Sequence, residues 1–298
     1  MAPEISEAPV PSDAVPRQHR LRRLGTGIAV LLLAALGILV YALVHQVKPL
    51  LVGSGCQAVA GRMTMPLDPE QASIAATIAG VARRRHLPDR AVAIAYAAAL
   101  QESKLHNLSY GDRDSVGVFQ QRPSEGWGPA KKLQDPVYAS KRFFQVLTSV
   151  HGYRRVPLYQ AAQAVQHSAD GQAYQQYDGQ AQRLALAFTG QDAHAVWCWS
   201  PTAPRGKAQL TAARAELART FGHVGSASTD PPAATPSLQV QTHSQAQGWA
   251  VASWLVTHAG QYRLHKVRYA GYEWQAKSGT SGWIRHGGTV AASGVQAS

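Results

Sequence analysis

The chain has 298 residues, a formal net charge of +12 and 45% hydrophobic residues, which excludes a wholly disordered protein and allows one core with smaller appendages. The positive charge comes from dispersed arginines and lysines without a long basic run, which argues against a nucleic-acid-binding arm. A diffuse positive surface suits anionic polymers in general. Abundant Ala, scarce Phe and a charged fraction of only 15% favour a mainly helical fold.

The N-terminal part of the chain predicts a membrane anchor. Residues 1–23 are rich in Pro and Ala and are expected to form a disordered tail. Gly25–Val44 follows with twenty uncharged residues, about the length needed to cross a bilayer, so we predict a transmembrane helix at 24–45. Arginines precede it, so the tail is expected in the cytoplasm and the rest outside a plasma membrane crossed once. The alternative is a cleaved signal peptide, which the length of the stretch disfavours.

The two cysteines fit this placement. Cys56 lies near the start of the predicted main domain, 46–222, and Cys198 lies near its end. A disulfide between them would clamp both ends of one domain, whereas two buried free thiols are the alternative. Two cysteines without neighbouring histidines do not make a zinc site, so we expect no metal.

Helices dominate the predicted main domain. Asp68-Pro69-Glu70-Gln71 has the cap, proline and acid that open a helix, which we expect to run towards Arg85. A second helix is expected at 89–104, with Glu102 on a stripe of alanines. The Gly-rich stretch 106–129 is expected to be a loop that shapes a cleft. Further helices are expected at 136–150, 158–168, 179–189 and 205–221.

The C-terminal part of the chain predicts a separate module. Residues 223–247 are polar and contain Pro and Ser, as a linker does. We expect a small α+β module at 248–298, with a helix at 249–259 and a hairpin at 266–275. About fifty residues form a marginal core, so this module is expected to pack on another part of the protein.

Glu102 is the candidate for chemistry. Cleavage of a glycosidic bond needs a carboxylic acid that stays protonated near neutral pH, and apolar surroundings raise the pKa of a Glu in general. The sequence places Glu102 among alanines at the end of a helix and beside a Gly-rich loop. The alternative is an ordinary solvated Glu near a helix end.

The residues after Glu102 decide between these interpretations. Ser103 follows it directly, and Gly117, Gln120 and Pro123 stand fifteen, eighteen and twenty-one residues after Glu102. This spacing resembles the lytic transglycosylases of the soluble-transglycosylase type, within the lysozyme superfamily, where Glu-Ser precedes a Gly-Leu-Met-Gln-x-x-Pro signature at the same distances. The match covers residues 98–129 directly and extends loosely over 56–200.

The resemblance implies roles for individual residues. Glu102 would protonate the glycosidic oxygen between N-acetylmuramic acid and N-acetylglucosamine, and would then take the proton of the muramic C6 hydroxyl to give a 1,6-anhydro end. Gln120 would bind a substrate acetamido or hydroxyl group unless it caps its own loop. Ser103 would brace the helix end or contact sugar, and Gly117 would let the backbone approach the glycan. Phe119 replaces the usual Met of the substrate-binding signature with similar bulk.

Other expected site residues are less constrained. Trp127 would stack on a sugar or pin the loop to the core. The family's later Tyr-Asn-Ala-Gly-like motif is absent, and Gln166 is the nearest polar replacement, unless it is a surface residue. Asp112 or Asp114 would act as a second carboxylate in a lysozyme-type hydrolase, or would only stabilise the turn. The tryptophans of the C-terminal module would bind glycan or, more simply, fill its core.

Together these features predict a mainly helical, lysozyme-like domain behind a transmembrane helix, with an extracytoplasmic catalytic domain that faces the cell wall. The expected function is cleavage of peptidoglycan glycan strands by a lytic transglycosylase, without a metal or other cofactor. A lysozyme-type hydrolase and a non-catalytic wall-binding or scaffold protein are the alternatives. Nucleic acid is not an expected partner.

Overall fold

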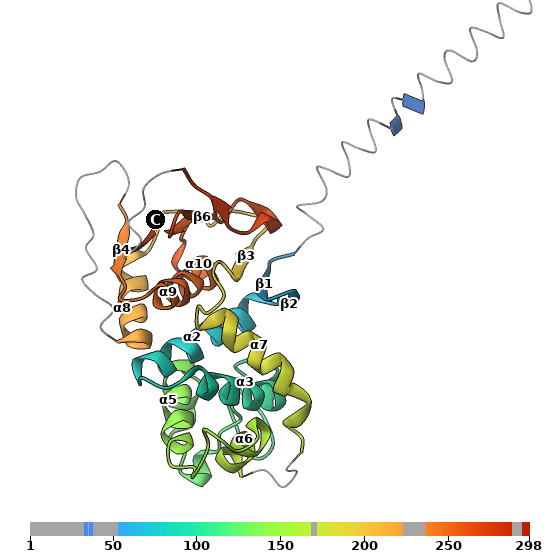
Figure 1. Ribbon diagram of the computed structural model, residues 1–298, viewed down its shortest axis with the longest axis vertical. Helices are drawn as coiled ribbons and strands as arrows, with labels where there is room; N and C mark the ends of the chain where they lie inside the picture. Colours follow the sequence, from blue (N-terminus) through green and yellow to red (C-terminus); the bar gives the residue numbers. More distant parts are fainter. Residues whose placement is uncertain (1–32, 35, 38–52, 168–171, 223–235, 288–293) are drawn as a thin grey trace, which may run out of the picture. The chain divides into compact units, whose positions relative to one another are not determined.

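The computed structural model describes residues 33–34, 36–37, 53–167, 172–222, 236–287 and 294–298 (Figure 1). The chain divides into two compact units, Met1–Val52 and Gly53–Ser298. The predicted tail at 1–23 lies outside the described residues, and so does the predicted span at 24–45, except for four helical residues. Among the helices that are described, none is long and apolar enough to cross a membrane.

The predicted fold class, a mainly helical protein behind a transmembrane helix, is wrong. About 48% of the structure is helical and 15% is strand, and the described residues form two antiparallel sheets. Because no described helix could cross a bilayer, the predicted single-pass localisation in the plasma membrane is contradicted too. Composition misled the prediction because the strands are short and use small residues, such as Ala58 and Ala60, on their buried faces.

The elements of the second unit follow one another in this order: β1 (Gly55–Ala60), β2 (Met63–Leu67), α2 (Pro69–Arg84), α3 (Asp89–Ser103), η1 (Pro123–Glu125), α4 (Ala130–Leu133), α5 (Pro136–Leu147), α6 (Leu158–Gln166), η2 (Gln175–Tyr177), α7 (Asp178–Phe188), β3 (Val196–Trp199), α8 (Leu210–Phe221), β4 (Leu238–Gln241), α9 (Gln245–Thr257), α10 (Ala259–Tyr262), β5 (Lys266–Tyr269), β6 (Tyr272–Gln275), η3 (Gly279–Ser281), β7 (Ile284–Arg285) and β8 (Gly294–Ala297). Most of the expected helices are present, within a few residues of the predicted ends.

The first sheet joins distant parts of the sequence. Its strand order is β2-β1-β3, and β3 pairs antiparallel with β1. In this register Cys56 lies opposite Cys198, and the two cysteines form a disulfide across a sequence separation of 142 residues. The predicted disulfide is therefore confirmed.

Helix α2 connects two halves of this unit: the helical half, which contains α3 to α7, and the C-terminal half, which contains α8 to β8. Asp68 caps it and accepts a hydrogen bond from the Gln71 N–H, while the Gln71 side chain accepts one from the Asp68 N–H. The helix contacts α3, α5, α8 and α9, and in Figure 1 it lies between the helices of the lower half and those of the upper half. A Cβ atom at Gly80 would come within 2.5 Å of the Thr220 side chain, so the missing side chain allows α2 and α8 to pack closely.

Helix α3 forms the centre of the helical half. Every residue from Ala91 to Leu100 is buried, and the helix contacts α2, α5, α6 and α7 (Figure 1). A helix that is apolar on all sides is stable only when other elements surround it, and its alanines let those elements approach closely. The expected helix at 89–104 is confirmed as α3, which brings Glu102 to the edge of the core.

The C-terminal segment packs on the rest of the unit. The second sheet has the order β4-β8-β5-β6-β7, and helix α9 contacts this sheet, α2 and β3. The expected hairpin is present as β5 and β6. The segment 223–247, predicted to be a linker, contains β4 and the start of α9. Strand β4 is an edge of the second sheet and pairs with β8. Residues 248–298 lie in the same compact unit as residues 53–222.

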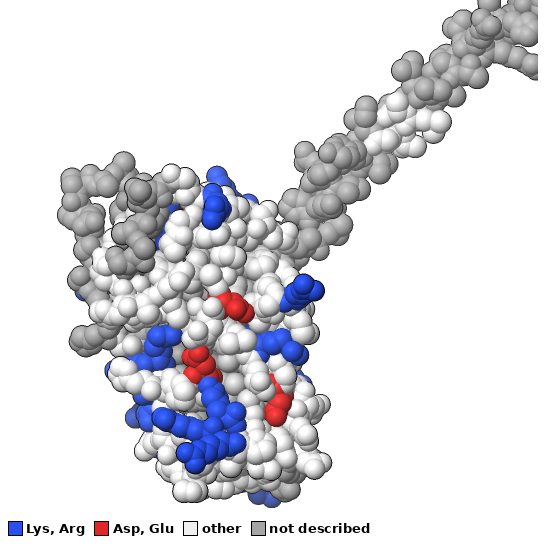
Figure 2. All heavy atoms as spheres, in the orientation of Figure 1, with Lys and Arg blue, Asp and Glu red and all other residues white. Residues whose placement is uncertain are grey.

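The surface charge is dispersed, as the sequence indicated. On the face shown in Figure 2, Lys and Arg side chains form separate groups with Asp and Glu between them. Lys141 has Arg84 and Arg219 as charged neighbours, with Asp135 and Glu216 nearby. Partial burial and the two neighbouring guanidinium groups lower the pKa of Lys141.

Candidate active site

Glu102 lies in a groove of about 750 Å³, which we call the Glu102 groove. Five of the predicted site residues line it, from α3, the loop that follows and α6: Glu102, Asp112, Gln120, Trp127 and Gln166. The groove also contains six residues that the sequence analysis did not select: Ser115, Gln121, Arg122, Glu125, His167 and Tyr174.

Tyr174 orients the Glu102 carboxylate. Glu102 is the second-last residue of α3 and is partly buried. The hydroxyl group of Tyr174, whose side chain is 1% exposed, donates a hydrogen bond of 2.6 Å to Glu102 Oε1. Within the described part of the chain, the other carboxylate oxygen, Oε2, has no protein partner, so Tyr174 binds one oxygen of the carboxylate and leaves the other unbound.

If Glu102 has the catalytic role expected from the sequence, replacing Tyr174 with Phe should reduce cleavage by about 10- to 100-fold, because a hydrogen bond to a charged group contributes about 1.5–3 kcal/mol. The initial rate of release of soluble fragments from peptidoglycan measures the effect. Tyr110→Phe is the matched control, since Tyr110 is 71% exposed and only its backbone oxygen bonds to the loop. Equal rates for Tyr174→Phe and the control would refute the orienting role.

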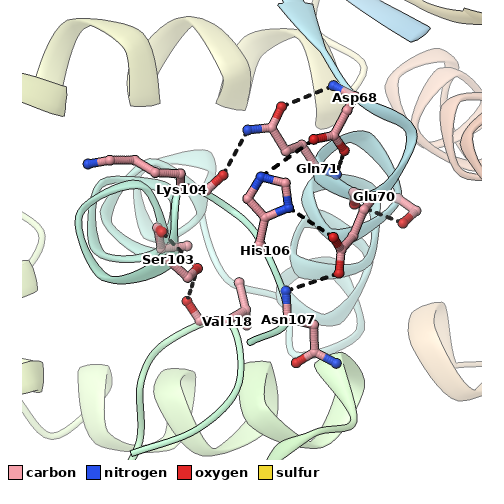
Figure 3. Close-up of polar contacts among 10 residues, drawn as sticks. Asp68, Glu70, Gln71, Ser103, Lys104, His106, Asn107 and Val118 are labelled. Atoms are coloured by element: carbon pink, nitrogen blue, oxygen red, sulfur yellow. Dashed lines mark hydrogen bonds and ion pairs between the residues drawn. The ribbon is translucent and has the colours of Figure 1, made fainter. Parts of the chain in front are cut away.

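Ser103 and Phe119 are buried residues that hold the end of α3 and the following loop in place. The Ser103 hydroxyl is buried and donates to Val118 O at 2.7 Å, which ties the end of α3 to the loop (Figure 3). Phe119 is fully buried and stacks on Phe143 with ring centroids 4.5 Å apart. Neither residue lines the Glu102 groove, and the Ser103 bond agrees with the alternative in which this side chain braces the helix end.

Gly117 allows a close approach between the loop and α4. Its φ is +80°, in the left-handed region that favours Gly, and a Cβ atom there would lie 2.5 Å from Leu133 O. Its N–H donates to Leu108 O at 2.7 Å. Gly117 thus shapes the loop and does not itself line the groove, which differs from the expected approach to glycan.

Gly117→Ala should lower the free energy of unfolding by about 2–4 kcal/mol, because the new methyl group would clash with backbone and the left-handed conformation would be strained. Thermal or denaturant unfolding measures this loss. Gly126→Ala separates the two causes, since Gly126 also has φ +80° but a Cβ atom there would have no neighbour within 4 Å. Similar losses for both variants would show that the contact with Leu133 O has no effect.

Gln120 is held by its own loop. Its side-chain Oε1 accepts from Ser115 Oγ at 3.0 Å, and its Nε2 donates to Gly117 O at 3.1 Å and Tyr110 O at 3.3 Å. These contacts agree with the second of the two interpretations of Gln120, in which its side chain caps its own loop instead of binding substrate. Gln120 still lines the groove, so substrate would meet a side chain that is already fixed.

Trp127 and Gln166 form other parts of the groove wall. Trp127 is only 8% exposed, and its backbone oxygen accepts from Arg142 Nε. Gln166 Nε2 donates to Phe119 O at 2.7 Å, so this side chain fastens α6 to the loop. Both residues are integrated in the packing of the groove, which limits their movement towards a ligand.

The two aspartates of the loop have different surroundings. Asp114 accepts hydrogen bonds from Ser124 N, Ser124 Oγ and Arg122 Nε, and the Ser124 N–H is the main cause that lowers its pKa to about 2. It does not line the groove and stabilises the loop instead. Asp112 lines the groove with a side chain that is 91% exposed, and Arg113 Nε lies 4.0 Å away. Of the two, Asp112 is the one placed to meet substrate.

Sequence reasoning missed Tyr174 because no local pattern connects it with Glu102. The two residues are 72 positions apart, and Tyr174 precedes the short η2 rather than lying within a helix. Arg122 and Glu125 could have been predicted more easily, because they lie one residue before and two residues after Pro123 of the motif. An ion pair joins them at the groove wall. Polar residues adjoining a motif are the signal that could have found this pair.

The tryptophans of the C-terminal segment do not form an exposed glycan-binding face. Trp249, Trp254 and Trp274 are each at most 2% exposed and fill the core. Trp283 is partly buried, and its indole N–H donates to Val196 O in the first sheet. These side chains therefore agree with the interpretation that the tryptophans fill the core of the C-terminal segment.

The fold combines helices with two antiparallel sheets, and its Glu102 groove holds a glutamate bound by a tyrosine hydroxyl. In the described part of the chain, no group of three or more His, Cys, Asp or Glu side chains could hold a metal ion. Comparison with models of protein families and with curated proteins found no match. Support for a function therefore comes from the Glu102 motif and the groove.

Proposed function

We propose that this protein cleaves the glycan strands of bacterial peptidoglycan as a lytic transglycosylase, with Glu102 as acid and then base. The observation that carries the proposal is the position of Glu102 in a groove of about 750 Å³, with Oε1 bound by the Tyr174 hydroxyl. The motif spacing from Glu102 to Pro123 supplies the substrate class by resemblance. A groove open to solvent suits a polymeric substrate.

The proposed reaction uses Glu102 twice. The protonated carboxyl group donates its proton to the oxygen that links N-acetylmuramic acid to N-acetylglucosamine, and the C1–O bond breaks. The ring then carries oxocarbenium-like positive charge, which the Glu102 carboxylate stabilises. The muramic C6 hydroxyl attacks C1 and gives its proton to Glu102, so the enzyme returns to its first state and the product is a 1,6-anhydro end.

A hydrolase is the second candidate, because Asp112 lines the same groove with a well-exposed carboxylate. In that mechanism Asp112 would activate a water molecule that attacks C1, and the product would be a reducing end. Asp114 is a poorer candidate for this task, since Arg122 and Ser124 occupy its oxygens.

The products distinguish these functions. We expect full-length protein incubated with purified peptidoglycan to release muropeptides with 1,6-anhydro ends, identified by mass spectrometry. Reducing ends would support the hydrolase, and their loss in Asp112→Asn would assign the second carboxylate. Binding to peptidoglycan without any released product would contradict both enzymatic mechanisms and support a non-catalytic wall-binding protein.

A further inference from the structure

The chain leaves α3 through an unusual turn that begins two residues after Glu102. Lys104 and Leu105 both adopt left-handed conformations, with φ of +56° and +64°, although neither is a glycine. Each such residue costs about 1–3 kcal/mol, so the turn persists only if its surroundings hold it. Leu105 is fully buried, which fixes the turn from the side of the core.

Helix α2 holds the other side of this turn through four polar contacts (Figure 3). Gln71 Nε2 donates to Lys104 O at 2.8 Å, and the Asn107 N–H donates to Glu70 Oε1 at 3.1 Å. The His106 ring lies between two carboxylates, with Nδ1 2.9 Å from Glu70 Oε2 and Nε2 3.4 Å from Asp68 Oδ2. We call these contacts the His106 clasp.

Both ring nitrogens of His106 face a carboxylate oxygen. A neutral imidazole has one N–H donor, whereas an ionised carboxylate only accepts, so only imidazolium can donate to both Asp68 and Glu70. The other charged group of this turn, Lys104, directs its ammonium group to the Tyr177 hydroxyl instead. Burial raises the pKa of Glu70, but the hydrogen bonds from His106 and the Asn107 N–H outweigh it and leave that pKa below its usual value.

The clasp is connected to the loop that forms one side of the Glu102 groove. Asn107 Nδ2 donates to Gln134 O at 2.7 Å, which anchors the turn on the segment after α4. The next residue, Leu108, accepts from the Gly117 N–H. Displacement of this turn would therefore move both the end of the Glu102 helix and the loop that carries Gln120.

We infer that His106 is a positioning residue for Glu102, and that its imidazolium form, held between Asp68 and Glu70, keeps the active site in its productive geometry. The inference rests on the proposed function. A neutral ring can donate to only one of the two carboxylates, so the turn then loosens, and activity that depends on the clasp is higher at low pH than at high pH.

The test compares full-length wild-type protein with His106→Gln, whose side chain can donate to one carboxylate but carries no charge. At about pH 5.5, we expect kcat to be about three- to tenfold higher in the wild type, with KM little changed. By about pH 8, where histidine is ordinarily neutral, the ratio of the two kcat values should approach one. Glu102 is present in both proteins, so the ratio of their kcat values isolates the effect of His106.

Amide hydrogen exchange provides a readout that does not need activity. Residues 104–109 should be better protected in the wild type than in His106→Gln at about pH 5.5, after correction for the intrinsic exchange rate, and the difference should vanish by about pH 8. His151→Gln, at an exposed site, is the matched control and should behave as the wild type at each pH. A wild type without cleavage activity would refute the proposed function, while exchange would still test the clasp.

A kcat ratio and an exchange difference that do not depend on pH would overturn the inference. If His106→Gln does not fold, Glu70→Gln replaces it, because it keeps an amide oxygen for the Asn107 N–H and removes one negative charge facing His106. A pH dependence in Glu70→Gln identical to that of the wild type would equally overturn the role of His106.

Discussion

Replacing Glu102 with Gln is expected to reduce the cleavage of peptidoglycan by about 10³- to 10⁴-fold, the contribution of a general acid and base. Gln has nearly the same shape, and its amide oxygen can still accept the hydrogen bond from Tyr174, so the groove should keep its geometry. The amide has no proton to give to the glycosidic oxygen at neutral pH. Release of soluble muropeptides, followed by liquid chromatography and mass spectrometry, measures the loss.

Glu125→Gln is the matched control for Glu102→Gln. Glu125 lines the same groove but is paired with Arg122 on the wall, so this variant should retain most of the activity. Unfolding curves of both variants should coincide with that of the wild type. If Glu102→Gln releases muropeptides at the wild-type rate, the assigned acid is wrong whatever the products are.

Removing the disulfide with Cys56→Ala and Cys198→Ala together should lower the free energy of unfolding by about 2–5 kcal/mol. The bond joins residues 142 positions apart, so it restricts the unfolded chain strongly. It also links β1 with β3, two strands that pair in space but come from opposite ends of the helical half. Denaturant unfolding monitored by tryptophan fluorescence measures the change.

A reductant offers an independent check on the disulfide. Wild-type protein in excess dithiothreitol should unfold at the same denaturant concentration as the double variant, while Ser54→Ala, close to the same sheet, should not shift the transition. No residue of β1 or β3 lines the Glu102 groove, so cleavage below the melting temperature should be nearly unchanged. An unchanged midpoint in the double variant would show that strand pairing alone holds this sheet.

Several local features could be predicted because neighbouring residues determine them. The capping box at Asp68 and Gln71 and the proline at Pro69 start α2 where expected. The expected hairpin at 266–275 is present as β5 and β6, and the expected helix at 89–104 is present as α3. In each case the deciding interactions lie within a few residues along the chain, so the pattern is readable without the fold.

The sheets and the domain boundary were less predictable. Strands β1, β3, β4 and β8 have only four to six residues each, and the pairs β1–β3 and β4–β8 join segments that lie far apart in the sequence. A short strand becomes stable only when its partner satisfies its backbone groups, and neither segment alone shows that pairing. The same cause made β4 part of an expected linker.

The sequence by itself determined the start and course of α2 and α3, the disulfide between Cys56 and Cys198, and the choice of Glu102 through its spacing to Gly117 and Gln120. The tertiary structure decided what surrounds that glutamate. Tyr174 reaches it across 72 residues, whereas Gln120 turns to its own loop. Hydrogen bonds between distant side chains depend on how helices pack, and that packing depends on buried surface contributed by the whole chain.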